Sequence, residues 1–174
     1  MEPTLVQFSG LPGTGKTALA HRLARRLQIP VISFDHFVDY SWPQRLLDAE
    51  TLKDQEFWHI LFSNAELQLS LGVSVIMDAV FYKQAGRDRA KNLCGQYQAR
   101  YRPIYTYCSD EYLWQQRTQQ PRENARPNDP PAGWQNALAA QKEFEPWQTS
   151  EALFVDAAKS LDSNLLAVVE YVMY

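Results

Sequence analysis

Short apolar runs alternate along the chain with longer segments in which apolar residues recur every three or four positions. The apolar runs are typical of buried strands, and they cover residues 4–9, 30–34, 73–77, 102–108 and 152–156. After the first run, Leu19, Leu23 and Leu27 recur at helical spacing, which predicts an amphipathic helix. Because strands and helices alternate, we expect an α/β domain with a parallel sheet that is covered on both faces.

Start signals place the other helices between the remaining strands. "TLKD" at 51–54 fits a capping box, and the helix that it opens extends to about Leu71. Further helices are predicted at 84–94, from Ser109–Glu111 to about Gln119, from Asn128 or Asp129 to about Phe144, and from Asp162 onward. Residues 120–131, "QPRENARPNDPP", are rich in proline and predict an irregular surface segment. Without repeats or a linker, residues 1–174 are interpreted as a single domain.

The segment "GLPGTGKT", residues 10–17, matches the phosphate-binding pattern G-x-x-x-x-G-K-[ST]. It lies between a predicted strand and a predicted helix, where backbone N–H groups and the helix N-terminus favour a bound anion. We therefore expect Lys16 to reach the β- and γ-phosphates of ATP, and the Thr17 hydroxyl to ligate Mg²⁺. The predicted binding residues are Gly10, Leu11, Pro12, Gly13, Thr14, Gly15, Lys16, Thr17 and Ala18.

Two aspartates follow predicted strands, so the carboxyl-end rule for parallel sheets directs both toward the same crevice. Asp78 follows "VSVIM" and is a candidate Mg²⁺ ligand, although a carboxylate in this position can also cap a turn. Asp35 ends the second strand and is a candidate catalytic base that accepts a proton from an attacking hydroxyl group. Its alternative role is to cap the segment that starts at His36.

Arginines in the later part of the chain are candidates for stabilising a transferred phosphoryl group. Arg117 ends a predicted helix, while Arg122 and Arg126 lie in the proline-rich segment. Residues of about 118–131, which include this segment, could form a lid over the bound nucleotide. Arg87 and Arg89 begin the helix after Asp78 and could reach an acceptor or a phosphate. The alternative for each is an ordinary solvated surface arginine.

Composition narrows the class of protein without fixing the substrate. The 174 residues carry a net charge of −3, which gives no global attraction to nucleic acid. Cys94 and Cys108 lack metal-site spacing and are expected to be reduced thiols. No apolar run approaches the ~20 residues that span a bilayer, and "MEPTLVQF" has no signal-peptide pattern. We therefore expect a cytoplasmic protein with no membrane partner.

The chain resembles the small P-loop kinases of the nucleotide-kinase-like group, which includes polynucleotide 5′-kinases, gluconate kinase, chloramphenicol phosphotransferase and zeta-toxin-like proteins. Its likeness is greatest to bacterial "AAA domain" kinases. The resemblance is carried by "GLPGTGKTALA", "ISFD", "VIMDAVFYKQAGRDRA", "QQR", "AAQKEFEP" and "LFVDAA". It implies a P-loop NTPase three-layer sandwich with strand order 2-3-1-4-5 and a short lid. It also implies that Asp35 acts on the acceptor hydroxyl, that Arg122 or Arg126 contacts ATP phosphates, and that Arg117 packs near the base or phosphates.

Together these features predict an ATP-dependent kinase that transfers a phosphate to the hydroxyl group of a small molecule, with Lys16, Asp35 and Arg126 as its catalytic residues. The acceptor-binding segment is expected at about 36–60, where aromatic residues could line a pocket. A polynucleotide 5′-hydroxyl end is an alternative acceptor, although this segment is acidic and suits an anionic polymer less well. A regulatory protein that binds ATP without catalysis is an alternative of another class. The acceptor and the oligomeric state are left open.

Overall fold

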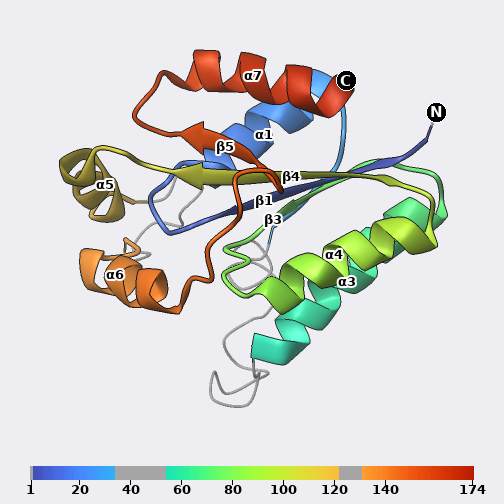
Figure 1. Cartoon of the computed structure of the whole chain (residues 1–174), viewed down its shortest axis with the longest axis horizontal. Coiled ribbons are helices and arrows are strands. Elements are labelled where there is room, and N and C mark those ends of the chain that lie inside the picture. Colours follow the sequence, from blue (N-terminus) through green and yellow to red (C-terminus); the bar gives the residue numbers. More distant parts are fainter. Residues whose placement is uncertain (1, 34–53, 122–130) are drawn as a thin grey trace.

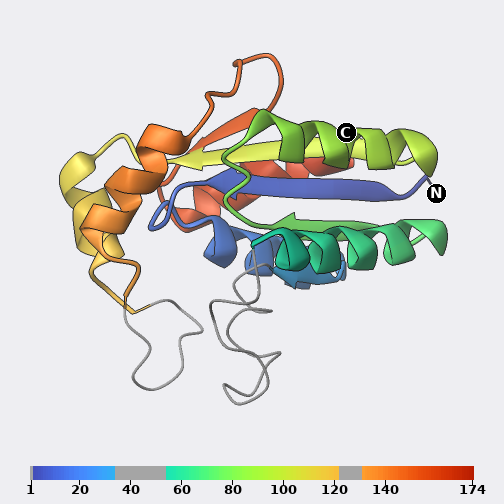
Figure 2. The same ribbon diagram turned by 90° about the horizontal axis from the view of Figure 1, so that it is seen from below.

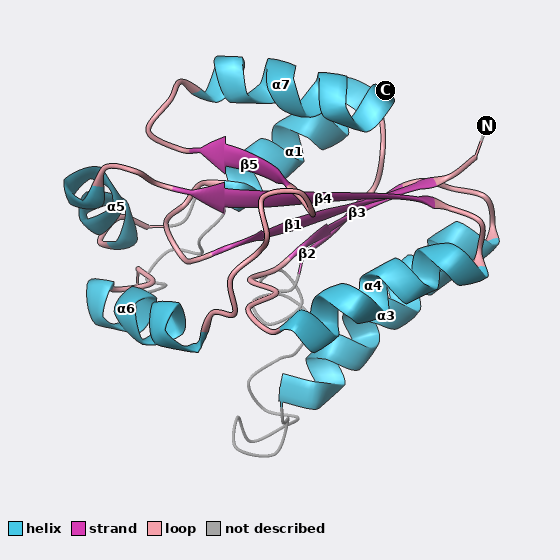
Figure 3. Ribbon diagram, in the orientation of Figure 1, coloured by secondary structure: helices cyan, strands magenta, loops and turns pink. Residues whose placement is uncertain are grey.

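The computed structural model describes residues 2–33, 54–121 and 131–174, and within them five parallel strands form one sheet (Figure 3). The strands are β1 (Thr4–Gly10), β2 (Val31–Ser33), β3 (Val75–Asp78), β4 (Arg100–Tyr107) and β5 (Leu153–Asp156). Their order in the sheet is β2-β3-β1-β4-β5, which confirms the predicted order 2-3-1-4-5. The central β1 pairs with β3 on one side and β4 on the other.

Helices cover both faces of this sheet and one of its ends. Figure 1 shows α1 (Lys16–Leu27) and α7 (Leu161–Met173) on one face, with α3 (Asp54–Ser70) and α4 (Gln84–Gln96) on the other. Two shorter helices, α5 (Glu111–Thr118) and α6 (Trp134–Glu143), lie beyond the carboxyl ends of the strands, as Figure 2 also shows. The carboxyl ends of β1 and β3 and the start of α1 therefore face the same region of the molecule.

Alternating side chains of β1 supply the two cores. Val6 and Phe8 pack with residues of α1 and α7, whereas Leu5 packs with residues of α3 and α4. All three side chains have no exposed surface. Burial on both faces explains why the strands read as continuous apolar runs in the sequence.

One predicted helix boundary is wrong. The helix expected to start at Asn128 or Asp129 begins at Trp134, and its N-cap is Gly133 with φ 81°. The Gly133 amide donates a hydrogen bond of 2.8 Å to the Thr118 carbonyl at the end of α5. A residue with this backbone conformation cannot lie inside a helix, so the helix starts after the glycine rather than beside the prolines.

Other helix starts agree with the sequence more closely. The Asp110 carboxylate caps α5 by accepting a hydrogen bond from the Leu113 amide, as the predicted start implies. At α7 the cap is Ser160, which accepts from the Ser163 amide, and Asp162 lies in the first turn. Two predicted regions extend beyond the described residues: 36–53 of the acceptor segment and 122–130 of the lid. None of the helices in the described ranges has the length and apolar character needed to cross a membrane.

Candidate active site

A pocket of about 880 Å³ opens at the carboxyl edge of the sheet, around the loop that joins β1 to α1. From the loop and the first turns of α1 it is lined by Pro12, Gly13, Thr14, Gly15, Lys16, Thr17 and Ala18. Among the predicted binding residues, Gly10 and Leu11 do not line this pocket. Leu11 instead packs with Trp114 of α5 and Ala137 of α6 in a third buried cluster.

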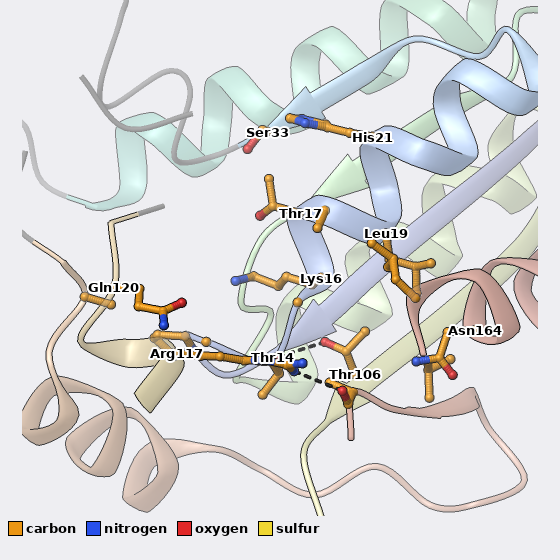
Figure 4. A pocket seen from close by; sticks show the side chains of 18 of the residues that line it. Thr14, Lys16, Thr17, Leu19, His21, Ser33, Thr106, Arg117, Gln120 and Asn164 are labelled. Carbon is orange, nitrogen blue, oxygen red and sulfur yellow. Dashed lines mark hydrogen bonds between the residues drawn. The ribbon is translucent and has the colours of Figure 1, made fainter. Parts of the chain in front are cut away.

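Close contacts behind the loop hold its curvature. The Gly10 amide donates to the Val80 carbonyl at 3.2 Å, which ties the loop to the segment after β3. A Cβ atom on Gly10 would lie 2.4 Å from the Thr106 carbonyl oxygen, so only glycine allows this approach to β4. The hydroxyl groups of Thr14 and Thr106 are hydrogen-bonded at 2.9 Å, as the dashed line in Figure 4 shows. The loop is therefore braced by the segment after β3 and by β4.

Lys16 is the first residue of α1 and is 7% exposed. Its ammonium group has no hydrogen bond or ion pair with any other residue in the described part of the chain, and the first turn of α1 carries no acidic residue. Figure 4 shows Lys16 in the pocket near Thr17, at the helix N-terminus. A buried cation with no counterion among the described residues, beside the positive end of a helix dipole, makes this position suitable for an anion.

A carboxylate at the end of β3, a hydroxyl group at the end of β2 and the hydroxyl group of Thr17 in α1 are oxygen donors at this end of the sheet; the carboxylate does not line the pocket itself. Asp78 is the last residue of β3, is 2% exposed, and pairs in register with Phe8 of β1. The Ser33 hydroxyl at the end of β2 donates to Asp78 Oδ2 at 3.2 Å. Ser33 and Thr17 both line the pocket. Because carboxylate and hydroxyl oxygens are the ligands that Mg²⁺ prefers, this donor set fits the predicted metal.

Arg117 of α5 also lines the pocket, together with residues of the turn after β5. Its guanidinium Nη1 donates to the Ala157 carbonyl at 2.9 Å. That turn is held by Asp156, whose carboxylate accepts hydrogen bonds from Ser109 and from the Ala158 amide. Although desolvation opposes the effect, these hydrogen bonds lower the pKa of Asp156 below its usual value. The predicted nucleotide-binding arginine is therefore positioned on a structured wall of the pocket.

The structure places Arg87 away from the pocket, which corrects the expectation that it reaches a phosphate or an acceptor. Its guanidinium group is buried, lies 4.6 Å from the ring centroid of Trp147 and 5.7 Å from that of Phe144, and donates to the Glu145 carbonyl at 2.8 Å. Burial lowers the pKa of Arg87, while Glu145 opposes the shift. Arg89 lies over the ring of Phe62, 4.1 Å from its centroid. Neither arginine lines the pocket.

Several residues of the site have no motif that could have revealed them. Thr106 and Trp114 reach the loop from β4 and α5, over sequence separations of 92 and 102 residues. Ser33 could have been found, because it stands at the end of a predicted strand beside Asp35. Three predicted residues, Asp35, Arg122 and Arg126, lie outside the described residues.

Comparison with known proteins adds a family and a set of similar folds. The family described as "AAA domain" matches residues 5–146. None of the curated proteins compared with the chain matches it significantly.

Solved structures resemble the whole chain at low sequence identity. A gluconokinase from Sinorhizobium meliloti 1021 is 16% identical, with a TM-score of 0.64 over 98% of this chain and 94% of that one. An APS kinase from Mycobacterium tuberculosis in complex with AMPPNP and APS is 17% identical, with a TM-score of 0.68 over 99% of each chain. Kti12 from Chaetomium thermophilum in complex with ADP-AlF3 is 15% identical, with a TM-score of 0.69 over 97% of this chain and 98% of that one. These likenesses confirm the fold that the sequence predicts, that of the small P-loop kinases.

Proposed function

Because the chain belongs to the AAA domain family, we propose that it is a phosphotransferase that moves the γ-phosphate of ATP to a hydroxyl group of a small molecule. The observation that carries the proposal is Lys16, a buried cation with no partner among the described residues, placed at a helix N-terminus inside the pocket. A triphosphate would supply the missing negative charge, and the backbone N–H groups of the loop would donate to its oxygens.

Thr17 and Asp78 are the residues that would hold Mg²⁺ at this site. When bound, the ion would neutralise charge on the phosphates during transfer. Ser33 donates to Asp78 Oδ2 and so fixes the direction in which that carboxylate points. Through this hydrogen bond, β2 would help to orient the metal ligand.

Nucleotide specificity would depend on the wall formed by Arg117 and the turn after β5. The guanidinium group of Arg117 donates a hydrogen bond to the Ala157 carbonyl, so it is held in a fixed position rather than being a free surface charge. We propose that Arg117 contacts the base or phosphates of ATP, and that Arg122 and Arg126 of the lid contact the phosphates, with Arg126 stabilising the transferred group.

Asp35 is proposed as the base that accepts the proton of the attacking hydroxyl. It follows Ser33 by two residues, and Ser33 contacts the proposed metal ligand Asp78 at the carboxyl edge of the sheet. The carboxylate would abstract the proton as the oxygen of the acceptor bonds to the γ-phosphorus and the bond to the β-γ bridging oxygen breaks. ADP and a phosphate ester are the products.

A small acceptor is favoured over a polynucleotide by the charge of the chain. The pocket lining also includes His21, Arg25, Val31 and Val80. The chain has a net charge of −3, and a long anionic strand needs an extended basic channel, so a compact alcohol is the better-suited acceptor.

A phosphotransfer screen with Mg²⁺-ATP over sugars, nucleosides, antibiotics and oligonucleotide ends tests this proposal. We expect a phosphate ester of one small-molecule class, and we expect Asp35→Asn to lose transfer while it retains ATP binding. Transfer by Asp35→Asn at the wild-type rate would show that this base is wrong. Phosphorylation of oligonucleotide ends alone would favour the polynucleotide alternative, and ATP binding without transfer to any acceptor would favour a regulatory protein.

A further inference from the structure

The phosphate-binding loop is held from outside by a tryptophan of α5. Trp114 Nε1 donates a hydrogen bond of 2.7 Å to the carbonyl of Pro12. The preceding carbonyl, that of Leu11, accepts from the Thr14 hydroxyl at 2.7 Å and from the Thr14 amide at 3.3 Å. Two consecutive carbonyl groups of the loop are therefore engaged by donors of the protein, one of them supplied from a distant helix.

Peptide geometry determines what this contact does to the next amide. Within the described residues there are no cis peptide bonds, so the carbonyl of Pro12 and the N–H of Gly13 point in opposite directions. Since the carbonyl points toward Trp114, the N–H of Gly13 points away from α5. In the described part of the chain this amide donates to no backbone carbonyl, and Gly13 lines the pocket.

We infer that Trp114 is a positioning residue that turns the Gly13 N–H toward the phosphates of the bound nucleotide. The inference rests on the proposed function, because it assigns an orienting device to the same loop. Trp114 does not line the pocket. Its indole acts through the planar peptide between Pro12 and Gly13.

The packing around α5 gives this device the rigidity that it needs. Gly13 has φ +80°, and a Cβ atom on it would lie 2.7 Å from Thr118 Cγ2 and 3.3 Å from Trp114 Cδ1. The loop thus sits directly against α5. Trp114 is 6% exposed and packs edge-on to Trp134, with ring centroids 4.8 Å apart.

Trp114→Phe tests the inference, because it keeps an aromatic ring in the cluster and removes the donor. Trp134→Phe is the matched control: it alters the same cluster, and Trp134 has no hydrogen bond to the loop in the described part of the chain. The probe is inorganic tripolyphosphate with Mg²⁺, titrated calorimetrically well below the melting temperature of each variant, because it reports phosphate binding without a base or ribose.

We expect Trp114→Phe to bind tripolyphosphate about fivefold to tenfold more weakly than wild type, the effect of losing one hydrogen bond. Trp134→Phe should match wild type within about twofold, as a substitution away from the loop does. In steady-state transfer, KM for ATP should rise in Trp114→Phe with kcat unchanged, because the Gly13 amide would contact ground state and transition state alike.

Equal affinities of Trp114→Phe and wild type would overturn the inference. So would equal losses in the two variants, because they would indicate packing rather than the indole donor. Should Trp114→Phe not fold, replacement of the Trp114 indole by benzothiophene, with sulfur in place of N–H, applies the same criteria at constant shape. Wild-type protein that binds neither tripolyphosphate nor ATP would instead contradict the proposed function, which separates the two failures.

Discussion

Lys16 of α1 and Arg87 of α4 are both buried cations, but the residues around them differ. Lys16 begins α1 and forms no hydrogen bond or ion pair with other described residues. Arg87 lies against two aromatic rings and donates to the Glu145 carbonyl. A buried charge that a hydrogen bond and aromatic rings stabilise supports the fold, whereas one with no such partner among the described residues is available to a ligand.

The largest expected effect is that of Lys16→Ala on nucleotide use. We expect phosphotransfer to fall by roughly 100-fold or more, because the variant removes the cation that would stabilise the charge of the transferred group. The free energy of unfolding should not decrease, since no hydrogen bond or ion pair between Lys16 and another described residue is lost, and the uncompensated burial of its charge is relieved. Arg26→Ala removes the same charge from an exposed position of α1 and is the control, measured by the same transfer assay and urea unfolding.

Asp78→Asn should lower transfer by about tenfold to 100-fold, because an amide is a weaker Mg²⁺ ligand than a carboxylate. The loss should be partly recovered at high Mg²⁺ concentration. Kinetics at graded Mg²⁺ measure this directly. An unchanged Mg²⁺ dependence would place the metal ligand elsewhere.

Arg87→Ala should show the opposite pattern to Lys16→Ala. The variant loses the stacking on Trp147 and the hydrogen bond to Glu145, which should destabilise the fold by about 2 kcal/mol. Affinity for tripolyphosphate should be unchanged, as titration of the folded variant can establish. Arg89→Ala, which removes an exposed guanidinium from the Phe62 ring, should cost only about 0.5 kcal/mol.

If Arg87→Ala retained wild-type stability and lost tripolyphosphate binding, the contrast between the two cations would be wrong. Arg87 would then belong with Lys16 as part of the ligand site.

The smallest expected effect concerns Glu145, the residue whose carbonyl accepts the hydrogen bond of Arg87. The Glu145 carboxylate accepts a hydrogen bond of 2.5 Å from the Gln84 amide at the start of α4. The backbone amide of Glu145 donates to the Tyr82 carbonyl. Glu145→Gln removes the negative charge that complements the helix N-terminus, and it should destabilise the fold by roughly 0.5 kcal/mol. Urea unfolding at low and high salt should show the difference shrinking as salt rises.

The sequence predicted the parts of this molecule that local patterns encode. The strand order followed from the resemblance, and the loop from Gly10 to Thr17 followed from its spacing. The role of Arg87 could not be predicted, because its partner Glu145 is 58 residues away and contributes a backbone carbonyl that carries no side-chain signature. Trp114 is similar, since its acceptor is also a carbonyl, 102 residues distant.

The α6 boundary failed for a related reason. Proline and asparagine are strong local start signals, but Gly133 is held in a positive-φ conformation by a hydrogen bond to the end of α5. Long-range contacts of this kind decide a boundary that the local sequence leaves open.

The central claim is that the phosphate bound at Lys16 is transferred to a hydroxyl group rather than to water. The most direct measurement follows γ-labelled ATP with Mg²⁺ and the acceptor panel, and it separates labelled phosphate ester from labelled inorganic phosphate. We predict that wild-type protein places the label in an ester and that Lys16→Ala leaves it in ATP. Label found only as inorganic phosphate, or left in ATP by the wild type with every acceptor, would contradict this account.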